Sequence, residues 1–252
     1  MSLFSVITVC RNPGPLLALS VKTLQNQTFR DFEHIIIDGG SNDGTLDYLK
    51  QNSHLFAKVI SEPDNGIYDA MNKGINQATG VYIYFLNCGD EFNDVQVLEK
   101  IGAACKASNA DVVYGDTLLV DKKKNTTRVK SHAGVDRFFL FHRPINHQAI
   151  FARRSVFERS GLFDTSYVVK ADHEWTMRCY NAGAVFRHVP VIVSSYLLHG
   201  FAYQNRAKYR AKEKKRLQYK HFKRSGMFLA RTLHRLGITP GGSIRNLLNA
   251  ML

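Results

Sequence analysis

The sequence has few cysteines and no long apolar run. Four of its 252 residues are cysteine, and no two of them form a Cys-x-x-Cys pair. Unpaired thiols of this kind are typical of proteins in a reducing cytoplasm. No stretch approaches the roughly 18 apolar residues that a membrane-spanning helix needs. The first ten residues lack the basic segment and the cleavage site of a signal peptide. We therefore expect a cytoplasmic protein, either free or bound to a membrane surface.

Acidic residues are scarce in the last fifth of the chain. Residues 202–252 hold 13 Lys and Arg but one acid, Glu213, whereas residues 1–201 hold 21 Lys and Arg and 20 acids. The net charge of +13 is therefore concentrated in a basic C-terminal extension, 202–252, which follows a nearly neutral domain, 1–201. Within the extension, the sequence predicts helix over 206–235 with a break at Gly226.

Strands and helices alternate along the first half of the chain. Helical spacing of apolar residues predicts helices over 15–25, 45–51, 67–78 and 95–107, and short apolar runs predict the strands. The order implies an α/β fold with a mainly parallel sheet flanked by helices. Further on, the pattern predicts a loop-rich stretch at 121–144, mostly helix over 151–180 and a strand at 188–198. The earlier strands are expected at 5–10, 34–37, 57–60, 81–86 and 111–114.

Polar clusters follow several of these strands, at Asn12 and within 38–43, 62–65 and 87–90. Ligands of such sheets bind at the carboxyl ends of the strands, so the clusters predict a binding site at that edge. Asp38, followed by two glycines, suits a contact with a base or ribose, or else a turn in which it binds local amides. Asp90 suits a hard cation such as Mg²⁺, or else a structural role in the loop or as a helix cap.

Two further residues are candidates for chemistry. Asp172 stands at the predicted start of a helix, where it is either an N-cap or a general base at the edge of a cleft. His147, followed by Gln148, suits a core histidine, a diphosphate ligand or a hydrogen-bond donor to a second substrate.

The blocks SVITVCRN, IIIDGGSNDGT, EPDNGIYDAMNKGINQATGVYIYFLNCGDEF and NHQAIFARRSVFERSGLFDTSYVVKADHEW occur in this order over about residues 3–200. Together they resemble the family-2 glycosyltransferases of the GT-A fold, and most of all the bacterial enzymes that assemble exopolysaccharide or lipopolysaccharide. The resemblance implies an inverting transfer from a nucleotide-sugar, with uridine diphosphate (UDP) the commonest carrier.

The resemblance also implies roles for particular residues. Asp172 would be the catalytic base, and Asp90 would face the diphosphate and a divalent cation, Mg²⁺ or Mn²⁺. His147 and Gln148 would lie on the acceptor or diphosphate side. The nucleotide would be held by Thr8, Val9, Arg11, Asp38, Asp64 and Lys73.

The chain departs from the family's pattern in two places. Asn87-Cys88-Gly89 stands where the family has its Asp-x-Asp metal motif, so both usual acids are absent. Ala171 replaces the acid that usually precedes the base. The first change weakens the expected metal site, since ligand charge largely sets metal affinity.

The expected partners are a nucleotide-sugar donor, a saccharide or lipid-linked acceptor, and an anionic membrane surface bound through 206–235. The extension could instead be a solvated basic helix docked on the rest of the protein. The degraded metal motif also allows a binding module that does not turn its donor over. A nucleic-acid-binding protein is less consistent with the sequence, because the basic residues are confined to one segment.

Overall fold

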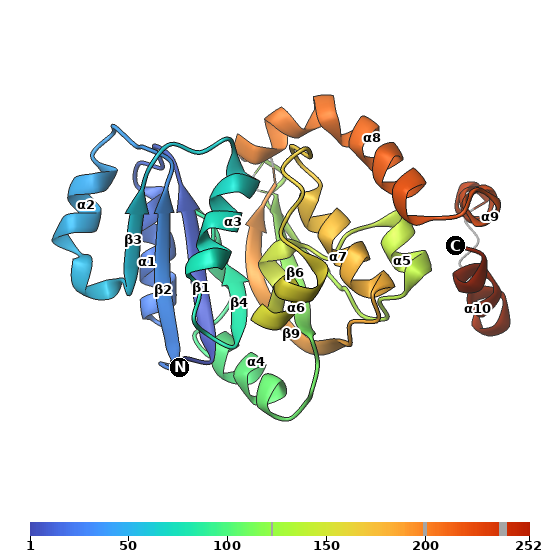
Figure 1. Ribbon diagram of the computed structural model, residues 1–252, viewed down its shortest axis with the longest axis horizontal. Coiled ribbons are helices and arrows are strands. Elements are labelled where there is room, and N and C mark those ends of the chain that lie inside the picture. Colours follow the sequence, from blue (N-terminus) through green and yellow to red (C-terminus); the bar gives the residue numbers. More distant parts are fainter. Residues whose placement is uncertain (122, 199–200, 237–240) are drawn as a thin grey trace.

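The computed structural model describes residues 1–121, 123–198, 201–236 and 241–252, and the side chains of residues 197, 201–207, 224 and 234 also lie outside the description. A sheet of nine strands runs through the centre of the molecule, in the order β3-β2-β1-β4-β8-β6-β9-β5, with β7 paired to β6 (Figure 1). The strands are β1 (Phe4–Cys10), β2 (Phe32–Asp38), β3 (Lys58–Ser61), β4 (Tyr82–Phe85), β5 (Glu91–Phe92), β6 (Val112–Asp121), β7 (Thr126–Lys130), β8 (Ile150–Arg153) and β9 (Phe186–Leu197).

The first four strands of this order are parallel, as are β6 and β9. The intervening β8 runs antiparallel to both β4 and β6, and the edge strands β5 and β7 are antiparallel to their neighbours. The predicted α/β class with a mainly parallel sheet is therefore confirmed.

Helices cover both faces of the sheet, and the apolar side chains of β1 are buried alternately on the two faces. Phe4 and Val6 pack with Ile101 of α4 on one face, whereas Ile7 and Val9 pack with Met71 of α3 on the other. Because successive side chains of a strand point to opposite faces, a buried two-sided strand is apolar throughout. The helices before the extension are α1 (Leu16–Gln25), α2 (Thr45–Gln51), α3 (Ile67–Gln77), α4 (Val97–Lys106), α5 (Arg137–His142), α6 (Arg154–Ser160) and α7 (Ala171–Asn181), with short 3₁₀ turns η1 (Ser53–Leu55) and η2 (His147–Ala149).

The prediction of a loop-rich stretch at 121–144 is wrong at 126–130 and at 137–142, which form a strand and a helix. The strand expected to end at residue 114 continues to Asp121 as β6, and β7 and α5 follow it. The β6–β9 register shifts at Gly115, where an added Cβ would lie 2.4 Å from the carbonyl oxygen of Val191. The glycine thus permits a close approach of two backbones inside a strand, and does not end it. The prediction of mostly helix over 151–180 is also wrong at its start, which is β8, and over 161–170, which separates α6 from α7.

The C-terminal extension forms three helices, α8 (Phe201–His221), α9 (Arg224–Arg235) and α10 (Gly242–Met251), and α8 passes over one end of the molecule before α9 and α10 (Figure 1). The predicted break is displaced: it falls at residues 222–223, and Gly226 lies inside α9. An added Cβ on Gly226 would lie 2.5 Å from the carbonyl oxygen of Met251, so this glycine lets α9 pack against the end of the chain.

The extension is docked on the rest of the protein. Leu217 and Phe222 are buried in the same apolar cluster as Trp175 of α7. Arg137 of α5 donates to the carbonyl oxygens of His221 and Leu252, at 3.1 and 3.0 Å. Among the described residues, no helix is long and apolar enough to cross a membrane.

Candidate active site

The carboxyl ends of β1 and β2 place Cys10 beside Asp38 at one edge of the sheet. The Asp38 side chain is buried, and its carboxylate accepts hydrogen bonds from Ser61 Oγ at 2.6 Å and from the backbone N–H groups of Gly40 and Ser41 at 3.2 and 3.0 Å. Burial alone would raise its pKa, but hydrogen bonds from Ser41 and Ser61 lower it. Asp38 therefore shapes the turn after β2, as the turn interpretation predicted, and its contact with a base stays a prediction.

Gly39 marks where two other nucleotide-site candidates meet. An added Cβ on Gly39 would lie 2.1 Å from Asp64 Oδ2 and 3.4 Å from Arg11 Cβ. The Asp64 carboxylate thus fills the space that any side chain on residue 39 would need. Lys73 lies next to it, bound to Glu62 at 2.8 Å and to the carbonyl oxygen of Pro63 at 2.7 Å.

Thr8 and Val9 are less accessible than the sequence suggests, since both side chains are buried. The Thr8 hydroxyl donates to the carbonyl oxygen of Leu86 at 2.7 Å and lies 3.0 Å from His34 Nε2. A nucleotide would therefore meet these two residues through their backbone.

A chain of polar side chains joins the end of β4 to the start of α7. His147 lies at its centre, with Nε2 3.1 Å from Asn87 Nδ2 and Nδ1 3.6 Å from Asp172 Oδ2. Tyr68 of α3 donates to Asp172 Oδ1 at 3.2 Å, and the backbone N–H of His173 donates to the same oxygen at 2.8 Å. The N-cap of α7 is Lys170, so Asp172 lies inside the first turn and the N-cap interpretation is wrong. The structure thus brings together two of the predicted site residues, Asp172 and His147.

Asp90 lies beside this chain, where Gln148 Nε2 approaches its Oδ1 at 3.5 Å. In the part of the chain that the structure describes, no group of three His, Cys, Asp or Glu side chains could hold a metal ion. The fit to a divalent cation is nevertheless adequate for an ion that keeps waters and substrate phosphates as ligands. Asp90 supplies one carboxylate, and Asn87 Oδ1 is a buried oxygen with no hydrogen-bond partner among the described residues.

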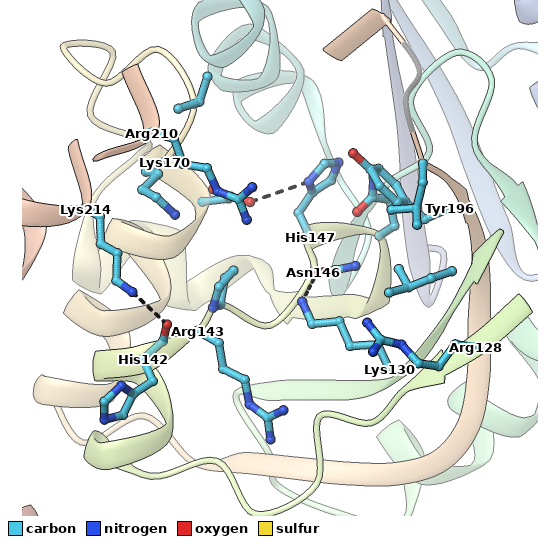
Figure 2. A pocket seen from close by; sticks show the side chains of 16 residues that line it. Arg128, Lys130, His142, Arg143, Asn146, His147, Lys170, Tyr196, Arg210 and Lys214 are labelled. Carbon is cyan, nitrogen blue, oxygen red and sulfur yellow. Dashed lines mark hydrogen bonds and ion pairs between the residues drawn. The ribbon is translucent and has the colours of Figure 1, made fainter. Parts of the chain in front are cut away.

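His147 and Asp172 also line a cavity of about 390 Å³ (Figure 2). Its walls come from β7, the α5–η2 loop, the segment before α7, β9 and α8. Asp172 is the one acid among the described residues that line it. Its basic lining residues are Arg128, Lys130, Arg143, Lys170, Arg210 and Lys214, which we call the six-cation cluster.

Sequence reasoning missed Tyr68 and four of these cations. Tyr68 lies in an ordinary helical pattern, so nothing in the sequence distinguishes it from a core residue. Arg128, Lys130, Arg143 and Lys170 come from segments whose structure was predicted as loop or helix. The basic run at 122–130 is a signal for Arg128 and Lys130, whereas no local signal marks Arg143 or Lys170.

The match to a protein-family model and the similarity to curated proteins agree. Residues 5–178 match the model described as glycosyl transferase family 2. The chain is 35% identical over 203 residues to a PGL/p-HBAD biosynthesis glycosyltransferase of Mycobacterium bovis, covering 77% of this chain and 76% of that protein. It is 34% identical over 111 residues to a cholesterol galactosyltransferase of Borreliella burgdorferi, covering 43% of this chain and 31% of that protein.

Solved structures with low sequence identity share the fold. The structure of S. aureus TarS in complex with UDP-GlcNAc has a TM-score of 0.65 at 17% identity, over 82% of this chain and 61% of that one. The mannosyltransferase PcManGT of Pyrobaculum calidifontis, in complex with GDP-Man and Mn²⁺, has a TM-score of 0.65 at 16% identity, over 83% of this chain and 61% of that one. The chain thus spans about three fifths of these two proteins. The GT-A fold expected from the sequence is confirmed, and the chain belongs to glycosyl transferase family 2.

Proposed function

We propose that this glycosyltransferase inverts the anomeric centre as it moves a hexosyl group from a nucleoside-diphosphate donor, most simply a UDP-sugar, to a saccharide or lipid-linked saccharide. The product would belong to a surface polysaccharide or glycolipid. The observation that carries the proposal is the continuous polar chain from Asn87 through His147 to Asp172, which ends at a cavity large enough for a second substrate. The UDP-GlcNAc complex of TarS and the glycolipid-assembly name of the mycobacterial relative support the choice of substrates.

In this mechanism the acceptor lies in the cavity with a hydroxyl at Asp172. Asp172 takes the hydroxyl proton as the oxygen attacks the anomeric carbon from the face opposite the leaving group, and the bond from that carbon to the diphosphate oxygen breaks. Tyr68 and His147 hold the Asp172 carboxylate in place through its two oxygens. Gln148 orients Asp90.

The negative charge that develops on the diphosphate must be stabilised. Asp90 and Asn87 would hold a divalent cation at this point, and that cation would act as a Lewis acid on the leaving oxygen. Arg11, Asp64 and Lys73 would position the nucleoside at the edge formed by β1 and β2. Residues 1–201 would form the catalytic domain, with 202–252 as the extension.

The proposal is tested by Asp172→Asn. Loss of a general base typically lowers the rate by about 10²–10⁴, so transfer should fall by that factor while donor binding, followed by thermal shift, stays close to that of the wild type. His188→Asn is a matched control, since it removes a histidine paired to Asp116 away from the cavity. Near-normal turnover of the Asp172 variant would show that another group is the base. Donor binding without any transfer by the wild type would favour the binding module.

A further inference from the structure

The six-cation cluster is unusual because its charges come from separate parts of the chain and converge on one hollow (Figure 2). Two of the cations lie on β7, two on α8, one after α5 and one before α7. Arg128, Arg143 and Arg210 are exposed at the mouth, Lys130 and Lys214 are half-buried, and Lys170 is buried. Long-range folding is therefore needed to assemble the cluster.

The six cations make their hydrogen bonds to neutral groups, and not to carboxylates, among the described side chains. Among the side chains that the structure describes, no carboxylate forms an ion pair with any of the six. Two lysines are bound to neutral oxygens instead: Lys130 Nζ lies 2.5 Å from Asn146 Oδ1, and Lys214 Nζ lies 3.3 Å from the carbonyl oxygen of His142.

The cations also disfavour one another's charge. Burial, together with the nearby Arg143, lowers the pKa of Lys130 to about 8, while Asp172 opposes the shift. Burial likewise lowers the pKa of Lys170, with Arg210 and Lys214 acting in the same direction. Like charges held together in a partly desolvated hollow cost folding free energy, and a bound anion removes that cost.

Phosphate is the anion that this arrangement fits. Guanidinium groups bind phosphate oxygens in pairs, and ammonium groups add point charges around them. A volume of about 390 Å³ is within the range of small-molecule sites. The six basic side chains carry far more positive charge than the single carboxylate of Asp172 can balance, so the cavity suits an anion with more than one negative charge.

The position of the cavity indicates which substrate carries the anion. None of the residues expected to hold the nucleotide lines it, whereas Asp172 and His147 do. Since the cavity lies beside the base, an anion bound there would belong to the molecule whose hydroxyl the base deprotonates.

We propose that the six-cation cluster is a subsite for a phosphate or diphosphate group carried by the acceptor, which holds the acceptor while its hydroxyl faces Asp172. This rests on the proposed function for the identity of the base. It adds a class of acceptor, a phosphorylated saccharide or saccharide-lipid, and it gives the basic extension a role in substrate binding through Arg210 and Lys214.

The test measures binding of inorganic pyrophosphate and of UDP to the full chain by calorimetry, in EDTA and at low salt. The variant is Arg128→Gln/Arg143→Gln, since both side chains are exposed and their loss should leave the fold intact. The control is Lys212→Gln/Lys215→Gln, which removes the same charge from the exposed side of α8 without touching the cavity. We expect the variant to lose about tenfold or more in pyrophosphate affinity, the control to lose less than about threefold, and UDP affinity to be unchanged in both.

Other outcomes overturn the proposal in distinguishable ways. If pyrophosphate does not bind the wild type, or if the control loses as much affinity as the variant, the cluster is only a diffuse positive field. If pyrophosphate competes with UDP, or UDP binding falls in parallel in the variant, the cavity holds the diphosphate of the donor. These measurements need no turnover, so a failure of the proposed transfer reaction would show separately as binding of UDP without transfer.

Discussion

Asn87 and Cys88 stand at the end of β4, where their uncharged side chains leave Asp90 as the carboxylate that follows this strand. Asn87 contacts His147 through its amide nitrogen, and its oxygen is buried. An amide in this position neither repels Asp172 across the histidine nor binds a cation as strongly as a carboxylate would. We therefore expect weaker metal binding here than with an acid, and a neutral link from Asn87 through His147 to the proposed base Asp172.

We expect the transferase activity to depend on a divalent ion that Asp90 binds weakly. Asp90→Asn should raise the Mn²⁺ concentration needed for half-maximal rate by about tenfold or more, because the carboxylate contributes most of the protein's charge at this point. The measurement is initial rate against free Mn²⁺. Asp94→Asn is the control, since Asp94 is an exposed acid on the following turn that binds Lys100. Full activity in excess EDTA would show that cationic side chains alone stabilise the leaving diphosphate.

Individual site residues differed in how far the sequence could identify them. Asp172, His147 and Asp90 lie in blocks that resemble a family, so their neighbourhood could be inferred from the sequence alone. Tyr68 and Arg143 could not be found in this way, because their role depends on which distant segments pack beside them. The buried hydroxyl of Thr8 shows the converse, since only the fold reveals that it faces His34 and the carbonyl oxygen of Leu86.

Helices α7 and α8 are joined by a buried carboxylate. Glu174 of α7 is fully buried and is bound by Lys220 at 2.8 Å, by Arg178 at 3.0 Å and by His221 at 3.1 Å. Burial alone would raise the pKa of Glu174, but these three hydrogen bonds lower it to about 2. The group ties α7, which carries the proposed base Asp172, to the extension.

Glu174→Gln should lower the free energy of unfolding by roughly 3 kcal/mol, because it removes the charge of a fully buried carboxylate on which three hydrogen bonds converge. In the wild type, the folded-state pKa of Glu174 lies below its unfolded-state value. Its contribution is therefore complete above about pH 4.5 and is lost as the pH falls toward 2. Urea unfolding of the two proteins at pH 7 and at pH 3 measures both effects.

Glu158→Gln is the control for this prediction. Glu158 pairs with Arg154 at 2.8 Å but is 61% exposed, so its loss should change stability by less than about 0.5 kcal/mol. Equal effects of the two substitutions would contradict a special role for the buried cluster. A difference between wild type and Glu174→Gln that does not shrink at low pH would contradict the pKa argument.

Elements of the first half could be predicted because each strand there is a short apolar run closed by turn residues. In the second half, the strand expected at 188–198 is present as β9, but β8 and most of β6 could not be predicted, since β8 follows a buried 3₁₀ turn and β6 contains a glycine that usually ends a strand. In both cases the strand is specified by its neighbours: β8 pairs with β4 and β6, and Gly115 accommodates the backbone of β9. The neighbouring strands are distant in the sequence, so the local sequence does not identify them.

At one end of the molecule, α9 and α10 expose apolar and basic side chains (Figure 1). Phe228 is 76% exposed and Leu236 is 66% exposed, while Ile244 and Leu247 of α10 are also exposed. Two of the apolar residues in the predicted membrane segment 206–235, Leu217 and Phe222, are instead buried against the body. The side chains of residues 206, 207, 224 and 234 in that segment lie outside the described residues. We propose that this surface of exposed apolar and basic groups binds an anionic membrane.

Phe228→Ser/Leu236→Ser should weaken sedimentation with vesicles that contain anionic lipid, because the apolar contribution is lost and the electrostatic one remains. Binding of both proteins should fall as salt rises. Leu46→Ser/Val185→Ser, which alters exposed apolar residues away from the extension, is the control. Equal sedimentation of all three proteins, or none with any vesicle, would show that α9 and α10 do not bind a membrane.

The one acid of the extension has a particular place in the molecule. Glu213 of α8 is buried and accepts hydrogen bonds from the backbone N–H groups of Val168 and Val169, at 2.7 and 3.0 Å, a few residues before Asp172. Arg210 and Lys214, one helical turn before it and one residue after it, line the cavity.

It follows that the two sides of α8 should differ in how well they tolerate substitution. Changes to Glu213 or Leu217 should disturb the segment that presents Asp172, the proposed base, whereas changes to Lys212, Lys215 and Tyr219 should have little effect on catalysis. A scan of all substitutions along α8, read out by activity, should therefore show tolerance that rises and falls with the 3.6-residue period of the helix, and not with the sign of the charge removed.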